Sequence, residues 1–207
     1  TPIGYFEGIE EALARIGGNT YMMDAARVMT AGAVDLGEKP SVASAIVKYH
    51  LTERGRQAVN DAMDIHGGKA ICIGPRNYLG RTYQQIPVSI TVEGANILTR
   101  NMIIFGQGAI RCHPYLLKEV NATHDKNPDS ASLAFDEALM GHAKFTLRNT
   151  ANSFVYALFG NYIQDNAPEN STPETAVYYR QLARFSASFA FIADVGLMRL
   201  GGSLKRK

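Results

Sequence analysis

The residue with the clearest potential for chemistry is Glu93, a lone carboxylate in the apolar stretch V-S-I-T-V-E-G-A-N that begins at Val88. A glycine follows it directly, and a helical pattern starts at about Asn96. Burial without a partner favours the protonated carboxyl group, whereas a nearby helix N-terminus favours the ionised form. A carboxylate balanced between these influences can accept a proton and give it back. Considered alone, however, Glu93 is better explained as an ordinary acidic residue in the first turn of a helix.

The second candidate is D-I-H-G-G-K, residues 64–69, where a helical pattern ends on two adjacent glycines. Because Gly67 and Gly68 have no side chains, a ligand could approach their backbone closely. The simpler interpretation is an ordinary helix C-cap. The pattern is not G-x-G-x-x-G and does not follow a strand, so it does not predict a dinucleotide-binding fold.

The histidines and cysteines show no spacing that is typical of a metal site. Cys72 and Cys112 lie far apart without a C-x-x-C pair, and the five histidines form neither H-E-x-x-H nor a Cys/His pattern. The sequence also lacks G-x-S-x-G and a phosphate-binding loop. We therefore predict no metal and no disulfide framework, and we interpret His50 and His142 as partly buried structural residues.

The composition is that of a globular protein, with 46% apolar and 19% charged residues among 207. A net charge of +2 gives no field that would favour nucleic acid or an anionic membrane. The sequence shows no signal-peptide pattern and no run of about 18 apolar residues. Because it opens on Thr1 without a methionine, we expect a piece of a longer chain.

Two helical patterns would position both candidates. From Tyr5 to about Leu36, apolar residues recur at three- and four-residue steps until the segment G-E-K-P ends the pattern. A second pattern begins at Ser41, a plausible N-cap, and stops at the glycine pair, so the two helices should form an antiparallel hairpin. The side chains expected to be buried are Phe6, Ile9, Leu13, Ile16, Met23 and Val34, then Val42, Ile46, Tyr49, Ala58, Ala62 and Ile65, with Lys48, Glu53, Arg54 and Arg56 more exposed.

The first part of the segment that links these helices to Glu93 shows no helical period. Residues 69–80 are therefore expected to form a loop, whose length makes it a candidate functional segment. A short segment at 81–85 then leads through Pro87 to the Glu93 stretch. A third helix follows and ends on the approach to Pro114, with Ile97, Leu98, Met102, Phe105 and Ile110 on its apolar side.

The composition changes beyond Leu116, and the polar run N-A-T-H-D-K-N-P-D-S at 121–130 is typical of a linker. We place a boundary there, which gives domains 1–120 and 121–207. Residues 131–159 predict a helix, and T-P-E at 172–174 predicts the start of another that fades at Gly201. Their inner sides should carry Leu133, Leu139, Met140, Leu147, Ala151, Phe154 and Leu158, then Val177, Leu182, Phe185, Phe189 and Ile192. Without strand alternation, the predicted fold class is all-α.

Taken together, these features resemble the C-terminal helical domain of the acyl-CoA dehydrogenases. The shared order is a helix ending D-A-M-D-I-H-G-G-K-A, an R-x-Y segment, and V-E-G-A-N-I-L-T-R, which fits the catalytic-glutamate motif E-G-[TA]-x-x-x-x-R. The segments I-V-K-Y-H-L-T-E-R-G, G-Q-G-A-I-R-C-H-P and G-G-S-L-K-R-K are similar to long bacterial members that oxidise fatty acyl-CoA in β-oxidation. The resemblance implies a four-helix-bundle-type domain followed by additional helices.

The resemblance also implies a reaction, the α,β-dehydrogenation of a fatty acyl-CoA thioester to trans-2-enoyl-CoA. Glu93 matches the catalytic base, which removes the α-proton while the β-hydrogen leaves as hydride. In the family, the backbone N–H of this glutamate also binds the thioester oxygen, so Glu93 and Gly94 would contact the substrate. This catalytic role replaces the interpretation of Glu93 as an ordinary acidic residue in the first turn of a helix.

FAD is the cofactor that the resemblance implies. Gly67 and Gly68 match a glycine pair that approaches the adenosine diphosphate part of FAD across a dimer interface. Asp64, Ala95 and Ile97 match further flavin contacts, although glutamine is common in the family at the first position and threonine and glutamine at the other two. The side chains of Ala95 and Ile97 cannot donate hydrogen bonds, so their contacts would come from the backbone.

The implied partners are a fatty acyl-CoA substrate, an electron-transfer flavoprotein as electron acceptor, and further copies of the chain. We expect a cytoplasmic protein or one at the periphery of the inner membrane, with no nucleic-acid partner. Two alternatives remain open on these residues. One is an acyl-CoA oxidase of the same fold, and the other is a helical assembly module without chemistry, in which Glu93 is a structural acid.

Overall fold

The computed structural model describes residues 1–160, 167–201 and 203, except for the side chains of residues 102 and 105. The predicted fold class is confirmed, because the described residues form helices, turns and loops without any strand. The chain divides into two compact units, Thr1–Gly108 and Ala109–Lys207. In the described part of the chain, no helix is both long enough and apolar enough to span a membrane.

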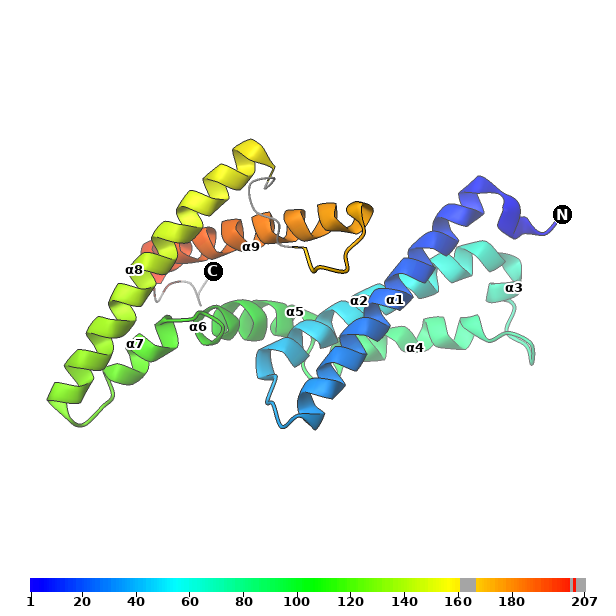
Figure 1. Ribbon diagram of the computed structural model, residues 1–207. Helices are drawn as coiled ribbons and strands as arrows, with labels where there is room; N and C mark the ends of the chain where they lie inside the picture. The colour runs from blue at the N-terminus through cyan, green and yellow to red at the C-terminus, as the bar shows by residue number, and fades with distance from the viewer. Residues whose placement is uncertain (161–166, 202, 204–207) are drawn as a thin grey trace. The chain divides into compact units, whose positions relative to one another are not determined.

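The first unit is built on the predicted helical hairpin. A single 3-10 turn, η1 (Ile3–Tyr5), precedes α1 (Glu7–Asp35), which packs along α2 (Ser41–His66), as Figure 1 shows in blue and light blue. Arg15 of α1 donates to both carboxylate oxygens of Asp61 on α2, at 3.3 and 3.1 Å. This two-pronged ion pair fixes the register of the hairpin, because its planar geometry allows little sliding.

Two local expectations for the hairpin are corrected by the structure. Ser41 is the first residue of α2, but Pro40 takes the N-cap position and no side chain caps this end. Ala12 is the one fully buried residue of α1 among those described, whereas Phe6, Leu13 and Val34 are 45–56% exposed. The periodicity thus predicted the helix correctly but overestimated how much of its apolar side is covered within this chain.

The loop predicted at 69–80 is shorter in the structure, because helices lie at both its ends. The short helix α3 (Gly68–Ile71) begins directly after α2, and α4 (Leu79–Thr91) includes the last two residues of the predicted loop. Asn77 joins them: its amide donates to the carbonyls of Ala70 and Cys72, and its oxygen accepts the first free backbone N–H groups of α4. Helix α4 continues through Pro87 because packing on α2 outweighs the missing backbone hydrogen bond.

The predicted third helix exists but has an unusual interior. It begins as α5 (Asn96–Leu98), widens into the π-helix η2 (Thr99–Gln107) and ends as α6 (Gly108–Arg111). Wide turns of this kind are rare in helices and often occur at functional sites. Both α4 and η2 pack against α2, so the Glu93 segment between them is anchored on both sides.

The second unit consists of α7 (Leu116–Ala122), α8 (Pro128–Phe159) and α9 (Pro173–Leu200). The predicted start of α9 is confirmed, since Thr172 caps the helix with its side chain and Pro173 occupies its first position. Helix α8, predicted from residue 131, begins three residues earlier at Pro128, within the polar run, and Asn127 caps it with its side chain. In Figure 1, α7 lies beside the first part of α8. Residues 109–120 therefore belong with the second unit, whereas the sequence pattern placed the division after residue 120, at the polar linker.

The buried side of α8 and α9 differs from the predicted one. The apolar residues that the pattern placed inside are all exposed, at 40–75% for the large ones, namely Leu133, Leu139, Met140, Leu147, Phe154, Leu158, Val177, Leu182, Phe185, Phe189 and Ile192. Buried instead are Ala138, Asn149 and Tyr156 of α8, with Ala187 and Asp194 of α9. Small side chains let the two helices approach closely, and the buried polar groups are satisfied by hydrogen bonds within the unit.

Candidate functional site

Glu93 lies in a tight turn between α4 and α5 and adopts a left-handed backbone conformation. Its φ of 55° is the one positive φ of a non-glycine residue in the described part of the chain, and Gly94 follows with a φ of 89°. A residue with a Cβ atom pays about 1–2 kcal/mol for this conformation. Strained residues that persist in a fold tend to lie at functional sites, so the backbone conformation supports Glu93 as a candidate functional residue.

The Glu93 side chain is exposed, which corrects the expectation of a buried carboxylate in an apolar run. The apolar residues before it belong to α4, and the turn carries Glu93 out of that helix. Among the described residues, its carboxylate has no hydrogen-bond or ion-pair partner, and its backbone N–H donates to none. An acceptor and a donor of one residue are therefore both free to meet a ligand on the same turn.

The turn is held in place by Lys48 of α2. The Lys48 ammonium donates to Asn96 Oδ1 at 2.5 Å and to the Gly94 carbonyl at 2.8 Å. A third, longer contact of 3.5 Å reaches the Ile90 carbonyl near the end of α4. An ammonium has three hydrogens, so these contacts use its full capacity. Lys48 was predicted to be among the more exposed residues of α2, but it is half-buried beneath the turn.

Asn96 connects the turn to α2 a second time. Its side-chain amide donates to Thr52 Oγ1 and to Glu53 Oε1, both at 2.9 Å, and the residue is only 4% exposed. Thr99, 2% exposed, adds a hydrogen bond of 3.2 Å to the Gly94 carbonyl. Glu93 and Gly94 are thus fixed through the polar side chains of Lys48, Asn96 and Thr99.

The glycine pair forms the other candidate region. Gly67 caps α2 with a φ of 54°, and a Cβ atom built on Gly68 would meet no other atom within 4 Å. A cavity of about 550 Å³ lies here and is lined by Ile3, Ile65, His66, Gly68 and Lys69. Space above bare backbone, beside an ammonium group, suits an anionic group of a ligand.

His66 is fixed next to this cavity by hydrogen bonds that settle its tautomer. Its Nδ1 lies 2.9 Å from the Ala62 carbonyl, so Nδ1 carries the proton. Its Nε2 therefore accepts a hydrogen bond from the Tyr78 hydroxyl, at 2.8 Å. The result is an imidazole of fixed orientation at the rim of the glycine region.

The predicted site residues fall into two groups at opposite ends of α2. Glu93, Gly94, Ala95 and Ile97 lie where Lys48 contacts the turn, whereas Asp64, Gly67 and Gly68 lie at the C-terminal end of α2. Nineteen residues of helix separate Lys48 from Gly67, which corresponds to about 28 Å. Asp64 is exposed, Ala95 is the N-cap residue of α5, and Ile97 is 68% exposed. The two groups of one chain therefore cannot contact the same flavin ring.

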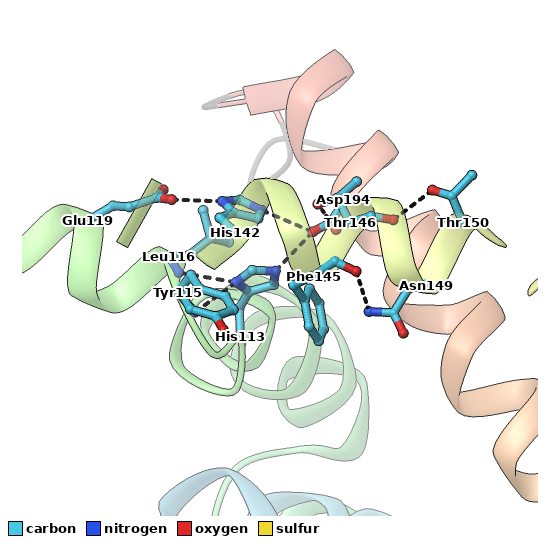
Figure 2. A network of polar contacts seen from close by, with 10 residues as sticks. All are labelled: His113, Tyr115, Leu116, Glu119, His142, Phe145, Thr146, Asn149, Thr150 and Asp194. Atoms are coloured by element: carbon cyan, nitrogen blue, oxygen red, sulfur yellow. Dashed lines mark hydrogen bonds and ion pairs between the residues drawn. The ribbon is translucent and has the colours of Figure 1, made fainter. Parts of the chain in front are cut away.

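The second unit holds a separate polar cluster that no sequence spacing revealed. Figure 2 shows His142 between two carboxylates, with its Nδ1 2.8 Å from Glu119 and its Nε2 3.4 Å from Asp194. Asp194 also receives hydrogen bonds from His113 Nε2 at 2.9 Å and from Thr146 Oγ1 at 2.7 Å. The side chains of Asp194 and His113 are only 2% and 5% exposed, so this network joins α7, α8 and α9 in their interior.

Backbone hydrogen bonds fix the protonation of His113. The N–H groups of Tyr115 and Leu116 donate to its Nδ1 at 3.2 and 3.1 Å, so the proton of the neutral ring is on Nε2 and points to Asp194. Burial is the main cause that lowers the pKa of His113 below the ordinary 6.5; Asp194 raises it and His142 lowers it further. His113 therefore acts as a neutral cap at the start of α7.

The protonation of His113 disfavours metal binding, although three potential ligand atoms lie close together. Ligand atoms of His113, His142 and Asp194 lie within 4.8 Å of one another. A metal on His113 Nε2 would require the ring proton to move to Nδ1, where two backbone N–H groups already donate. We interpret the cluster as a hydrogen-bond network that holds three helices together.

Comparison with known proteins identifies both units. Residues 1–106 match the family model described as acyl-CoA dehydrogenase, C-terminal domain, and residues 110–207 match the one described as acyl-CoA dehydrogenase, C-terminal, bacterial type. The two matched ranges meet where the structure divides into its two units. No solved structure matches the chain.

A curated relative matches the first unit only. The chain is 30% identical over 106 residues to a protein of Clostridium sporogenes (strain ATCC 15579) named 3-(aryl)acrylate reductase. The aligned region is 49% of this chain and 26% of that protein, so the chain spans about a quarter of the length of the relative it matches.

Proposed function

Because the chain belongs to the acyl-CoA dehydrogenase family, we propose that it forms the C-terminal helical part of a flavin-dependent enzyme that dehydrogenates an acyl-CoA thioester. The observation that carries this proposal is the Glu93 turn. A strained, clamped backbone presents a carboxylate and a backbone N–H that have no partners among the described residues. A base and an adjacent hydrogen-bond donor are what the removal of a proton next to a carbonyl requires.

In this proposal Glu93 acts twice. Its carboxylate takes the proton from Cα, and the electron pair of the broken C–H bond moves toward the thioester carbonyl. The backbone N–H of Glu93 donates to that carbonyl oxygen and stabilises its growing negative charge. When bound, FAD supplies the acceptor for the hydride that leaves Cβ. The organic product is the trans-2-enoyl thioester.

The glycine region fits the phosphate part of such a cofactor. Open space above Gly68, a neighbouring ammonium on Lys69 and a cavity of about 550 Å³ favour an anion held against bare backbone. Ala95 and Ile97 offer the cofactor no side-chain hydrogen bonds, so their contribution comes from backbone groups and apolar surface. Lys48, beside the Glu93 turn, and Gly67 are separated by about 28 Å along α2. This distance supports an arrangement in which the glycine pair of one copy contacts the flavin bound by another copy.

For the substrate we propose a fatty acyl-CoA, with an electron-transfer flavoprotein as electron acceptor. A second candidate follows from the relative, whose printed name describes the reduction of a 3-(aryl)acrylate. Reduction of an α,β double bond is the reverse of dehydrogenation, and the same base would then act as the proton donor. An acyl-CoA oxidase of the same fold differs only in passing electrons to oxygen.

The test is a Glu93→Gln substitution in the full-length enzyme. The amide keeps the shape of the side chain but cannot accept the α-proton. We expect turnover to fall by about 1,000-fold or more, with flavin content and melting temperature close to those of the parent. Activity near that of the parent would contradict the role of Glu93 as the base.

The substrate class is tested separately with the parent enzyme. Saturated acyl-CoA thioesters of increasing length should be oxidised when an electron-transfer flavoprotein or an artificial acceptor is present, with little oxygen uptake. Preferred reduction of an arylacrylate would favour the second candidate, and rapid oxygen consumption would favour the oxidase.

A further inference from the structure

Three acceptors around the Lys48 ammonium all belong to the segment that carries Glu93. The Ile90 carbonyl precedes Glu93, whereas the Gly94 carbonyl and Asn96 Oδ1 follow it. A single cation of α2 therefore bridges both sides of the turn. Packing on α2 and the contacts of Asn96 with Thr52 and Glu53 also hold this region, but among the side-chain hydrogen bonds of the described residues Lys48 is the one that joins residues on both sides of Glu93.

The orientation of Asn96 is determined by its neighbours. Its oxygen must face the Lys48 ammonium, which can only donate, and its amide nitrogen must face the Glu53 carboxylate, which can only accept. A flipped amide would lose both contacts. Asn96 is thus held between two side chains of α2, Lys48 as donor and Glu53 as acceptor. Helix α2 therefore determines the position of the turn.

The hydrogen bonds that restrain Glu93 end at the carbonyl of the next residue, Gly94. The carbonyl accepts from the Lys48 ammonium at 2.8 Å and from Thr99 Oγ1 at 3.2 Å. This carbonyl belongs to the Gly94–Ala95 peptide, so a half-buried donor and a buried one fix the backbone directly after the two positive φ angles of Glu93 and Gly94. Charge-assisted bonds of this kind are stronger than neutral ones and suit a strained segment.

We propose that Lys48 is a positioning residue for the reaction. Through Gly94 and Asn96 it holds Glu93 in its left-handed conformation, and so keeps the carboxylate and the backbone N–H aimed at one substrate carbon and its thioester oxygen. Lys48 touches neither substrate nor cofactor. The inference rests on the proposed role of Glu93, because it concerns how that residue is aimed.

The test compares substitutions at position 48 in the full-length enzyme. Lys48→Met keeps the length of the side chain and removes every donor, and Lys48→Arg keeps the charge and some donors. Lys39→Met serves as the matched control, since Lys39 lies in the exposed loop before α2 and its side chain makes no hydrogen bond or ion pair with a described residue. Flavin content and melting temperature are measured for each variant.

We expect Lys48→Met to lower kcat by about 100-fold, because small displacements of a reacting group have effects of this size. KM should change by no more than about threefold, since uniform binding is not altered. With substrate deuterated at Cα, the isotope effect on kcat should increase, because proton removal becomes slower. Lys48→Arg should recover part of the lost kcat and Lys39→Met should behave like the parent enzyme.

A double variant separates this inference from the proposed function. If Lys48 acts through residue 93, adding Lys48→Met to Glu93→Gln should lower the residual activity far less than the roughly 100-fold expected in the parent, because only the backbone N–H remains to be aimed. Parent-like kcat and isotope effect in Lys48→Met would overturn the positioning role while leaving Glu93 as the base. Should Lys48→Met fail to fold, an unchanged isotope effect in a folded Lys48→Arg would overturn it equally. Activity in Glu93→Gln near that of the parent would instead remove the proposed function itself.

Discussion

Glu93 combines a free carboxylate with a backbone conformation that glycine adopts without strain. A left-handed residue with a Cβ atom costs about 1–2 kcal/mol. The contacts of Lys48 and Thr99 with Gly94 hold the turn in spite of this cost. Glycine or asparagine would adopt this conformation at lower cost, so the strained glutamate supports the proposed catalytic role.

The strain predicts a trade-off between stability and activity. Glu93→Gly should relieve about 1–2 kcal/mol of strain and lose about 0.5–1 kcal/mol to the greater freedom of the unfolded chain. The net free energy of unfolding should therefore be unchanged or slightly higher, although the base is gone. Val92→Gly is the matched control, because Val92 has an ordinary φ of −74° and its substitution should only destabilise. Urea unfolding of both variants tests this, and equal destabilisation would mean that no strain is stored at Glu93.

The contacts of these residues could be predicted only in part. The E-G-A-N motif identified Glu93, and the pair of glycines identified the end of α2. Lys48 and Asn96 were missed because 48 positions separate them, and nothing local marks a lysine as the partner of a distant amide. A signal was available, however: Lys48 lies between Val47 and Tyr49 on a largely covered stretch of α2, where a charge needs a partner.

At the scale of the elements, helix ends were easier to predict than helix faces. Proline, threonine and glycine act on their nearest neighbours, so the start at Pro173 and the end at Gly201 were predicted from local chemistry, and the start of α8 lies within three residues of the predicted one. Which side of α8 is buried depends on α9, and there the polar residues Asn149 and Asp194 occupy the interior. Apolar periodicity alone assigned the opposite side, because it assumes that large side chains always face the nearest helix.

The His113 network predicts how the α7–α8–α9 unit responds to pH. Because burial lowers the pKa of His113 in the folded chain, the unfolded chain binds more protons between that value and about 6.5. Stability from this group is thus fully present above about pH 6.5 and is lost as the pH falls toward the folded pKa. The slope from one such group is at most about 1.4 kcal/mol per pH unit. Asp194, His142 and Glu119 are the charged or titratable groups that face it.

His113→Asn tests this response. The asparagine oxygen can still accept the N–H groups at the start of α7, but it does not titrate. Unfolding free energies measured between about pH 5 and 7.5 should fall less steeply with acid in the variant than in the parent. Identical slopes would show that His113 does not couple stability to pH. Added Zn²⁺ should leave the parent's melting temperature unchanged if Nδ1 keeps its backbone hydrogen bonds.

At the scale of the whole molecule, the length of α2 between the Glu93 turn and the glycine pair restricts how these two regions can contribute to one catalytic site. Lys48, which contacts the Glu93 turn, and Gly67 lie about 28 Å apart along α2, whereas the proposed base and the proposed cofactor-binding glycines would have to serve one catalytic site. The simplest solution is that the glycine pair of one copy completes the site of another. Such sharing makes the oligomer, rather than the single chain, the smallest active species.

Mixed oligomers of the full-length enzyme test this arrangement. Subunits with Glu93→Gln lack the base, and subunits with Gly68→Glu fill the open space above the glycine with a negative charge that repels an anion. Each homo-oligomer should be inactive. If sites are shared, a mixed oligomer contains one site with both defects and one with neither, so about half of the parent activity should return. If each chain completes its own site, every site carries one defect and mixing restores nothing. Tagged subunits that are co-expressed and purified as mixed species, with flavin counted per site, distinguish the two outcomes.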